Sequence, residues 1–372
     1  MQAISNKTLL AVTITVLLVT LFFGLRPKGF DFSNHVQWLQ ERSGIHFEKY
    51  GLIYANLDKE LVEREFSKDK GFSIEIAIQP ESFNKKGFQL ILTLHDGNDQ
   101  DQFILGQWSS SLIVMNGNDY NYRKKTKRIS QKIIPEPSKE IFLSITSGPK
   151  GTNLYIDGKL VQFAPKLTFQ FPHTNQPKLT LGNSVYGKHS WQGAVFGLGL
   201  YGYELAPATI ESHFKNWSNE KNFIFLKEDR PSLLYLFNEK NGKKVIDHID
   251  GKSPLIIPSK MHLLEKTILS PPVPDAELTK CFIQDAVINF LGFIPLGFFV
   301  AAVFSQFGHL QKQAIVLSVL LCFGLSLGIE ILQAWMPSRS SQSLDVILNT
   351  LGAMTGAFIH KRISFFIVFL VP

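Results

Sequence analysis

Two apolar runs, one at each end of the chain, constrain its fold most, because each is long enough to cross a bilayer. Residues 8–25 (TLLAVTITVLLVTLFFGL) contain no charged side chain, and residues 286–371 are mostly apolar. A helix of about 20 apolar residues spans a hydrocarbon core. Residues 27–280 are polar and mixed, so the sequence predicts a soluble domain held between membrane segments rather than one globule.

The first run is predicted to be an uncleaved transmembrane anchor. A cleaved signal has a shorter apolar core and a small-residue cleavage site, whereas this run has 18 residues and ends in LFFGLRPKG with no A-x-A pattern. The expected domains are therefore an anchor over 1–26, an extracytoplasmic domain over 27–280 and a membrane domain over 281–372.

Cysteine content and net charge exclude two further classes of protein, those held by disulfides and those that bind nucleic acid. The only two cysteines are Cys281 and Cys322, so no disulfide framework holds the middle domain. The formal net charge is +7. In a membrane protein such an excess reflects basic loops at the anionic cytoplasmic face, so we predict no nucleic-acid partner.

The middle domain reads as an antiparallel β-sandwich. From about residue 71, short runs rich in β-branched and aromatic residues follow one another, bounded by Gly, Asn, Asp or Pro. In GFSIEIAIQPE the apolar residues alternate with others, which predicts a strand with one buried face. Strands spaced by roughly 10 residues with turn signals between them are typical of a sandwich.

Several phrases add a family resemblance. NLYIDGKLV contains Asp157-Gly158, a two-residue hairpin signal. LTLGNS and then WQGAVFGLGLYGYELAPATI follow it. This order resembles the laminin G-like and concanavalin A-like family over roughly 45–265, which implies a jelly-roll sandwich that binds glycan or protein.

Catalysis and metal binding are not expected of the sandwich. Glycan-cleaving relatives need paired carboxylates on one strand, and no E-x-D-x-x-E pattern occurs. The loop DGNDQD offers Asp96, Asp99 and Asp101 as oxygen ligands, but it lacks the D-x-D-x-D-G spacing of a calcium loop. It is a weak calcium candidate, and no cofactor is otherwise predicted.

The C-terminal region predicts three further membrane helices. Residues 285–304 and 314–335 are long enough to span, and residues 344–359 reach across most of a hydrocarbon core. The last apolar run, 363–371, is too short to span alone, which leaves open whether it crosses the membrane. With the N-terminal anchor, the expected membrane domain is a bundle of about four helices.

Basic residues predict the orientation. His309 and Lys312 lie between the first two of these helices, and HKR at 360–362 follows the third. Alternating helices put both sites on one side, and basic residues mark the cytoplasm. The loop 336–343 and the sandwich then face outward, as expected for a multi-pass protein of a bacterial cell membrane.

Polar residues gather at the outer ends of these helices. Two lie at the start of the first predicted helix, two at the end of the second, one in the following loop and two at the start of the third. In that order they are Asp285, Asn289, Glu330, Gln333, Arg339, Asp345 and Asn349. A charge at a helix centre in lipid costs about 2.5–3.5 kcal/mol, less near an interface. We expect them to face inward, with Arg339 paired to the acids, as a ligand site. The alternative is that they only cap and bond helices.

The same residues carry a second resemblance. N-F-x-x-F-x-P-L-G-F includes Pro295 and Gly297, and G-I-E-x-x-Q includes Glu330. R-x(5)-D-V-x-x-N-x-x-G-A-x-x-G includes Gly352 and Gly356. This ordered set, over roughly 282–360, resembles the VanZ-like membrane family, named for a teicoplanin-resistance protein. The resemblance implies an envelope role, and the glycines imply close helix packing.

Three hypotheses remain open at this point. The first is an envelope protein whose sandwich binds glycan or protein, with a role in glycopeptide resistance or envelope maintenance. The second is a membrane enzyme or transporter for a lipid-linked sugar or phosphate, with Glu330 or Asp345 as acid or base. The third is an anchored adhesion module. No catalytic motif supports the second, so an enzyme is not favoured, and the sequence does not define the oligomeric state.

Overall fold

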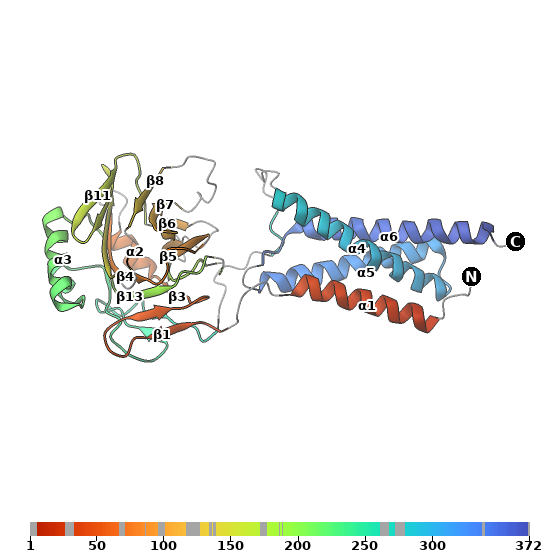
Figure 1. The fold of residues 1–372 in the computed structure, drawn as a ribbon, viewed down its shortest axis with the longest axis horizontal. Coiled ribbons are helices and arrows are strands. Elements are labelled where there is room, and N and C mark those ends of the chain that lie inside the picture. Colours follow the sequence, from red (N-terminus) through yellow and green to blue (C-terminus); the bar gives the residue numbers. More distant parts are fainter. Residues whose placement is uncertain are drawn as a thin grey trace. The chain divides into compact units, whose positions relative to one another are not determined.

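The computed structural model divides the chain into two compact units (Figure 1). One unit comprises Phe30–Glu265, and the other joins Met1–Gly29 to Lys266–Pro372. The structure describes residues 6–26, 33–66, 71–85, 87–95, 101–116, 127–133, 136, 139–171, 177–185, 187, 189–260, 268–271, 280–336 and 339–370.

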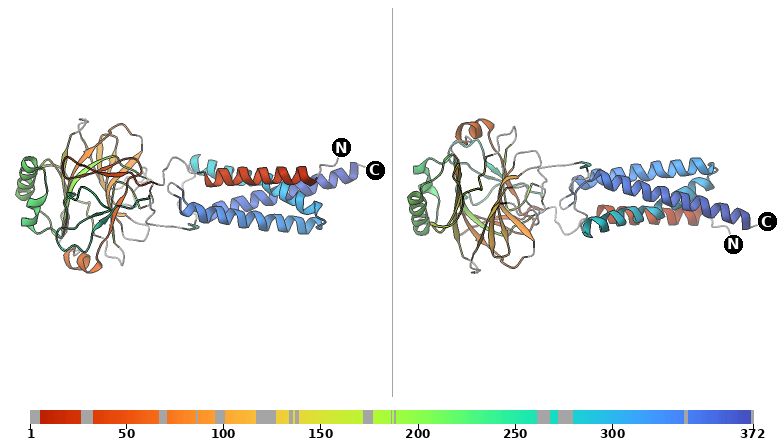
Figure 2. Two further views of the ribbon diagram at one scale, coloured as in Figure 1. Left: turned by 90° about the horizontal axis from the view of Figure 1, so that it is seen from below. Right: turned by 90° about the horizontal axis from the view of Figure 1, so that it is seen from above.

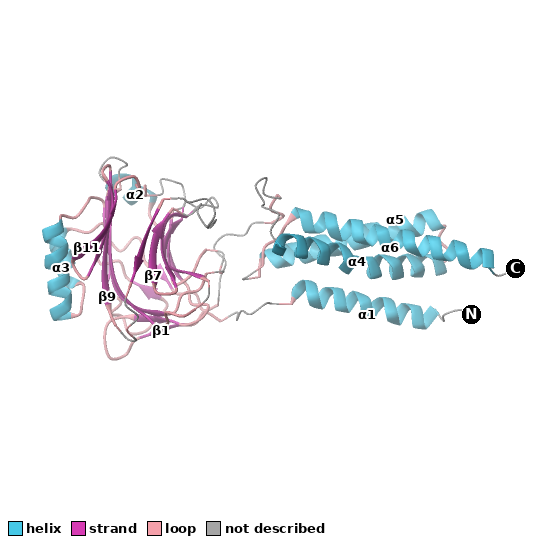
Figure 3. Ribbon diagram, turned by 45° about the horizontal axis from the view of Figure 1, so that its top comes forward, coloured by secondary structure: helices cyan, strands magenta, loops and turns pink. Residues whose placement is uncertain are grey.

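The first unit is an all-β sandwich of two antiparallel sheets, the fold class expected from the sequence (Figure 3). One sheet has the order β1 (Val36–Trp38), β2 (Ile45–Phe47), β13 (Gly193–Tyr201), β4 (Phe72–Pro80), β9 (Ile141–Gly148), β10 (Gly151–Ile156) and β11 (Lys159–Ala164), with β14 (Leu233–Tyr235) also paired to β13. The other has the order β15 (Lys244–Val245), β16 (Leu255–Ile256), β3 (Ile53–Asn56), β12 (Lys178–Leu181), β5 (Phe88–His95), β6 (Asp101–Trp108), β7 (Ser111–Met115) and β8 (Arg128–Lys132).

Strand β4 shows how the alternating sequence builds the core. Ile74, Ile76 and Ile78 project into the main cluster between the sheets. The alternation predicts one buried face, but the opposite face of β4 is buried too, because Ala77 belongs to a second apolar cluster. That cluster includes Trp217 of helix α3 (Pro207–Glu220), which lies on the outer face of this sheet (Figure 1).

The predicted hairpin at Asp157-Gly158 joins β10 to β11. Both turn residues have positive φ, 50° for Asp157 and 75° for Gly158, and Ile156 pairs with Lys159 across the turn. This conformation matches the right-handed twist of the flanking strands. Helix α2 (Lys59–Glu65) and the 3-10 helix η3 (Ile224–Asp229) complete the unit.

Four helices form the second unit (Figure 2). They are α1 (Asn6–Leu25), α4 (Lys280–Gln306), α5 (Gln311–Ala334) and α6 (Ser343–Leu370). Within the described residues, α1, α4 from Phe282 and α5 are long and apolar enough to cross a membrane. Helix α6 is longer, but it carries polar side chains from Ser343 to Ser364. The final apolar run continues it to Leu370 instead of forming a separate segment.

Helix α1 packs as a member of this bundle. Val16, Leu17 and Leu21 lie partly buried against a core that includes Phe293 and Ile329. In a hydrocarbon environment the backbone must satisfy its own hydrogen bonds, which is why each segment is helical. The apolar runs therefore form one helical unit although residues 26–279, roughly the length of a whole domain, separate α1 from α4.

Helices α4 and α6 approach each other backbone to backbone at three glycines. A Cβ added at Gly297 would overlap the carbonyl oxygen of Ala353. The same holds for Gly352 against Phe290 and for Gly356 against Ile294. Small residues permit this approach where lipid offers no hydrophobic drive between helices. Pro295, inside α4, lies on its exposed side.

Candidate functional site

The predicted polar residues of the membrane unit lie at the ends of α4 and α5, at the start of α6, and in the loop before it. Glu330 is the most buried, at 2% exposure, and Gln333 and Asn349 are also buried. Asp285 is exposed on the first turns of α4, and Asn289 is half-buried. Figure 1 shows both chain termini at the other end of this bundle.

Glu330 holds the start of α6. Its Oε2 accepts a hydrogen bond of 2.8 Å from the backbone N–H of Gln342, and the side chain of Ser341 bonds the same carboxylate. The N–H groups at a helix start have no partner within the helix and carry partial positive charge. A carboxylate from a neighbouring helix therefore serves here as a cap for the start of α6.

Two amide side chains bond neighbouring helices. Asn289 of α4 forms a side-chain hydrogen bond with Asp345 of α6. One turn further along α6, the Nδ2 of Asn349 donates to the Oγ of Ser326 on α5 at 2.9 Å. The Oδ1 of Asn349 is buried without a hydrogen-bond partner among the described residues.

Gln333 and Arg339 hold the end of α1. The Nε2 of Gln333 donates to the carbonyl of Gly24 at 2.7 Å. The Nη2 of Arg339 donates to the carbonyls of Arg26 at 3.1 Å and Phe23 at 3.3 Å. Orphan carbonyls at a helix C-terminus favour such cationic donors.

The structure does not show the expected direct pairing of Arg339 with the acids. Within the described part of the chain, the hydrogen bonds of its guanidinium go to backbone carbonyls and not to Glu330 or Asp345. The Nη2 of Arg339 instead donates to carbonyls at the end of α1, and its Nε is buried without a hydrogen-bond partner among the described residues. Glu330 accepts from the backbone N–H of Gln342, the residue before α6. The sequence therefore predicts that these residues gather in one region, but it does not predict their individual hydrogen-bond partners.

The weak calcium candidate falls largely outside the described residues. Asp96 and Asp99 lie there, and of Asp101 only the backbone is described, at the start of β6. No group of three or more His, Cys, Asp or Glu that could hold a metal ion occurs among the residues that the structure covers. Calcium at this loop stays a prediction.

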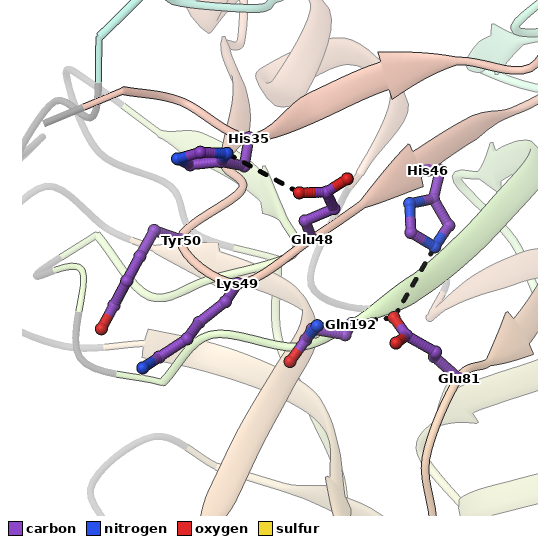
Figure 4. A pocket seen from close by; sticks show the side chains of 7 residues that line it. All are labelled: His35, His46, Glu48, Lys49, Tyr50, Glu81 and Gln192. Atoms are coloured by element: carbon purple, nitrogen blue, oxygen red, sulfur yellow. Dashed lines mark hydrogen bonds and ion pairs between the residues drawn. The ribbon is translucent and has the colours of Figure 1, made fainter. Parts of the chain in front are cut away.

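The sandwich carries an open pocket that sequence reasoning missed (Figure 4). It has a volume of about 420 Å³. Its lining comes from the segment before β1, from β2 and the following loop, from the end of β4 and from the start of β13: His35, His46, Glu48, Lys49, Tyr50, Glu81 and Gln192. No short motif marks it, because Glu81 and Gln192 meet the segment 35–50 only in the folded sandwich.

Two imidazole–carboxylate pairs frame this pocket. The Nδ1 of His35 lies 3.7 Å from Oε2 of Glu48, and the Nε2 of His46 lies 3.7 Å from Oε2 of Glu81 (Figure 4). The side chains are between 31% and 49% exposed, so water or a ligand reaches them. Gln192 donates from Nε2 to the Oε2 of Glu81 at 3.4 Å.

The loop after β2 presents an aromatic ring and a cation together. Tyr50 has a φ of 73°, and its N–H donates to the Oγ of Ser190 at 2.7 Å, which fixes the loop. The Nζ of Lys49 lies 4.7 Å from the centre of the Tyr50 ring. The pocket volume lies in the range of small-molecule sites, and its lining is mostly polar, with Tyr50 as its aromatic side chain.

The fold and these sites define the chain as a membrane protein with a β-sandwich domain. Residues 232–367 match the family described as VanZ/LLP1, a match that begins within the sandwich unit and runs through α6. Residues 54–211 match the concanavalin A-like lectin/glucanases superfamily. The chain therefore combines a VanZ-like membrane region with a concanavalin A-like sandwich, as the sequence motifs predict.

Solved structures offer more distant likenesses. The binding domain of botulinum neurotoxin DC, seen with rat synaptotagmin II, shares 17% identity over 44% of this chain and 40% of that chain, with a TM-score of 0.35. A Bacteroides ovatus protein described as carbohydrate binding shares 11% identity over 60% of this chain and 58% of that chain, with a TM-score of 0.41. The chain thus spans less than two thirds of each. No curated protein matches the chain.

Proposed function

We propose that this chain is a multi-pass protein of a bacterial cell membrane whose sandwich domain binds a glycan of the cell envelope. The observation that carries the proposal is the pocket around His46 and Glu81. Its imidazoles, carboxylates, amide and ammonium group offer both donors and acceptors, which is what a ring of hydroxyl groups requires. Tyr50 adds an aromatic face next to them.

A neutral saccharide fits the charge of this pocket. Two carboxylates, one ammonium group and two imidazoles line it, so neither sign of charge dominates. A strongly anionic ligand would meet Glu48 and Glu81, and a strongly cationic one would meet Lys49. Hydrogen bonding to hydroxyls remains as the main source of affinity, since bonds to charged groups contribute about 1.5–3 kcal/mol each.

The sandwich is proposed to lie outside the cytoplasm. Lys7 lies in the first turn of α1, Lys312 lies in the first turn of α5, and the HKR run at 360–362 lies in α6 beyond its apolar middle. Alternation of the four helices places these basic residues at one end of the bundle, and basic loops face the cytoplasm. The domain between α1 and α4 then joins the bundle from the opposite side.

For the polar cluster of the membrane unit, we infer a structural role in place of a site for a lipid-linked sugar or phosphate. Glu330 bonds the start of α6, and Gln333 and Arg339 bond the end of α1. An anion site would need an accessible cation, and the Nη2 of Arg339 already donates to backbone carbonyls, while its Nε is buried without a hydrogen-bond partner among the described residues. The observation therefore favours a binding protein over an enzyme or transporter.

A glycan array tests the proposed ligand class. Full-length protein in detergent micelles is applied to immobilised envelope saccharides, both neutral and anionic, alongside a His46→Ala variant. We expect binding to a subset of neutral saccharides that the variant loses. Binding to none, or equal binding by both proteins, would contradict the proposal. Susceptibility of a deletion strain to teicoplanin then tests the narrower role in glycopeptide resistance.

A further inference from the structure

A buried group of ionisable side chains lies beneath α3, away from the pocket. Glu75 of β4 is fully buried, and His213 of α3 is 2% exposed. The Nδ1 of His213 lies 2.7 Å from Oε2 of Glu75, and its Nε2 lies 2.8 Å from Oδ2 of Asp229 at the end of η3. One imidazole therefore joins a strand, a helix and a 3-10 helix.

The number of protons on this imidazole decides whether both contacts hold. Ionised carboxylates only accept hydrogen bonds, and a neutral imidazole donates through one nitrogen only. When both carboxylates are ionised, contacts with both ring nitrogens therefore require the doubly protonated imidazolium. Burial by itself would lower the pKa of His213, but the hydrogen bonds and charges of Glu75 and Asp229 outweigh it and raise the pKa above its ordinary value.

Glu75 and Asp229 differ in the other groups that can bond them when the contact with His213 is lost. Glu75 also accepts from the Oγ of Ser144 at 2.8 Å and from the hydroxyl of Tyr201 at 3.3 Å, so it stays bonded without His213. The side chain of Asp229 is 41% exposed and can turn to water. Loss of the proton therefore breaks the contact with Asp229 first.

The remaining groups around His213 carry no charge. Tyr201 stacks on the imidazole, with ring centres 6.4 Å apart, and Phe225 lies 5.6 Å from it. The hydroxyl of Tyr203 donates to the backbone carbonyl of Asp229 at 2.5 Å. Burial raises the pKa of Tyr201 and of Tyr203, so both phenols stay neutral near pH 7 and compete for no proton.

We propose that His213 is a pH-operated latch that keeps α3 and η3 closed on the sandwich while the imidazole is protonated. Opening would uncover the second apolar cluster, in which Trp217, Phe223 and Leu226 pack against the outer face of the sheet. The sign follows from linkage: stabilisation is complete below the ordinary pKa of about 6.5 and is lost as pH rises through the higher native pKa.

Hydrogen exchange of the full chain in detergent micelles tests the latch. Protection of amides in 207–229, corrected for the intrinsic pH dependence of exchange, is compared at pH 6 and pH 9. The amides of β4 serve as an internal reference. We expect protection in 207–229 to fall by roughly tenfold or more, while β4 is unchanged.

The Asp229→Asn variant gives the second arm of the test. An asparagine amide donates to a neutral imidazole and its carbonyl accepts from a charged one, so this variant should stay closed at both pH values. Protection in the wild type that does not change between pH 6 and pH 9 would overturn the proposal. So would an equal fall in wild type and variant.

Discussion

Gln333 and Arg339 show what single polar residues do in the membrane unit: they bond backbone carbonyls at the end of α1. Arg339 and Asp345 are close in the sequence and both charged, which suggests a pair. The pair does not form, because an open helix end offers the guanidinium several acceptors at once. The acceptor that Arg339 bonds depends on where α1 lies. Local sequence patterns cannot place a helix that is some 300 residues distant in the sequence.

Two double-mutant cycles distinguish an Arg339 that bonds the end of α1 from an Arg339 that pairs with Asp345. We expect Arg339→Ala and Gln333→Ala to be non-additive by about 0.5 kcal/mol or more, since both loosen the same helix end. Arg339→Ala and Asp345→Asn should add within about 0.5 kcal/mol, because the two residues share no hydrogen bond. Unfolding in detergent measures both cycles. Strong coupling between Arg339 and Asp345, together with additivity between Arg339 and Gln333, would contradict this account and support the ion pair.

Elements differ in how far the sequence alone predicts them. The isoleucines of β4 and the turn at Asp157-Gly158 act locally, so alternation and turn chemistry predict their structure correctly. The partner of Glu75 is His213 on α3, which no strand pattern reveals. The binding pocket draws on four segments between His35 and Gln192, and only the folded sheets bring them together.

Glycines set the fit between α4 and α6. Gly352→Ala should destabilise the bundle by roughly 1–3 kcal/mol, because the added Cβ would overlap the carbonyl oxygen of Phe290. Gly292→Ala is the matched control on α4, since no atom lies within 4 Å of its added Cβ. It should be neutral or stabilise by up to about 1 kcal/mol. Equal thermal stability of the two variants in detergent would show that α4 and α6 do not approach closely.

At the scale of the whole molecule, one chain builds two cores of different kinds. The sandwich buries a large apolar cluster without a cysteine in the segment between 30 and 265. The helical unit buries a smaller one, and α1 contributes to it from the other end of the sequence. Deletion of α1 as a dispensable anchor should therefore damage the VanZ-like unit, which its family match alone, over 232–367, does not indicate.

Cysteine labelling tests the proposed sidedness in intact cells. In a variant without the two native cysteines, Ser340→Cys should react with a membrane-impermeant maleimide. Leu310→Cys, at a position 71% exposed in the turn between α4 and α5, should react only after permeabilisation. The reason is alternation of the helices with the basic residues inside. The opposite pattern would invert the topology and place the sandwich in the cytoplasm.

The central claim is that the pocket of the sandwich binds a saccharide, and calorimetry tests it most directly. A neutral saccharide that binds on the glycan array is titrated into the full-length protein and two acid-to-amide variants. Glu81→Gln alters the pocket, whereas Glu63→Gln alters an exposed carboxylate of α2 that pairs with Lys59. We predict that Glu81→Gln weakens binding by about tenfold or more and that Glu63→Gln binds as the wild type does. Equal affinity of the two variants would contradict the account.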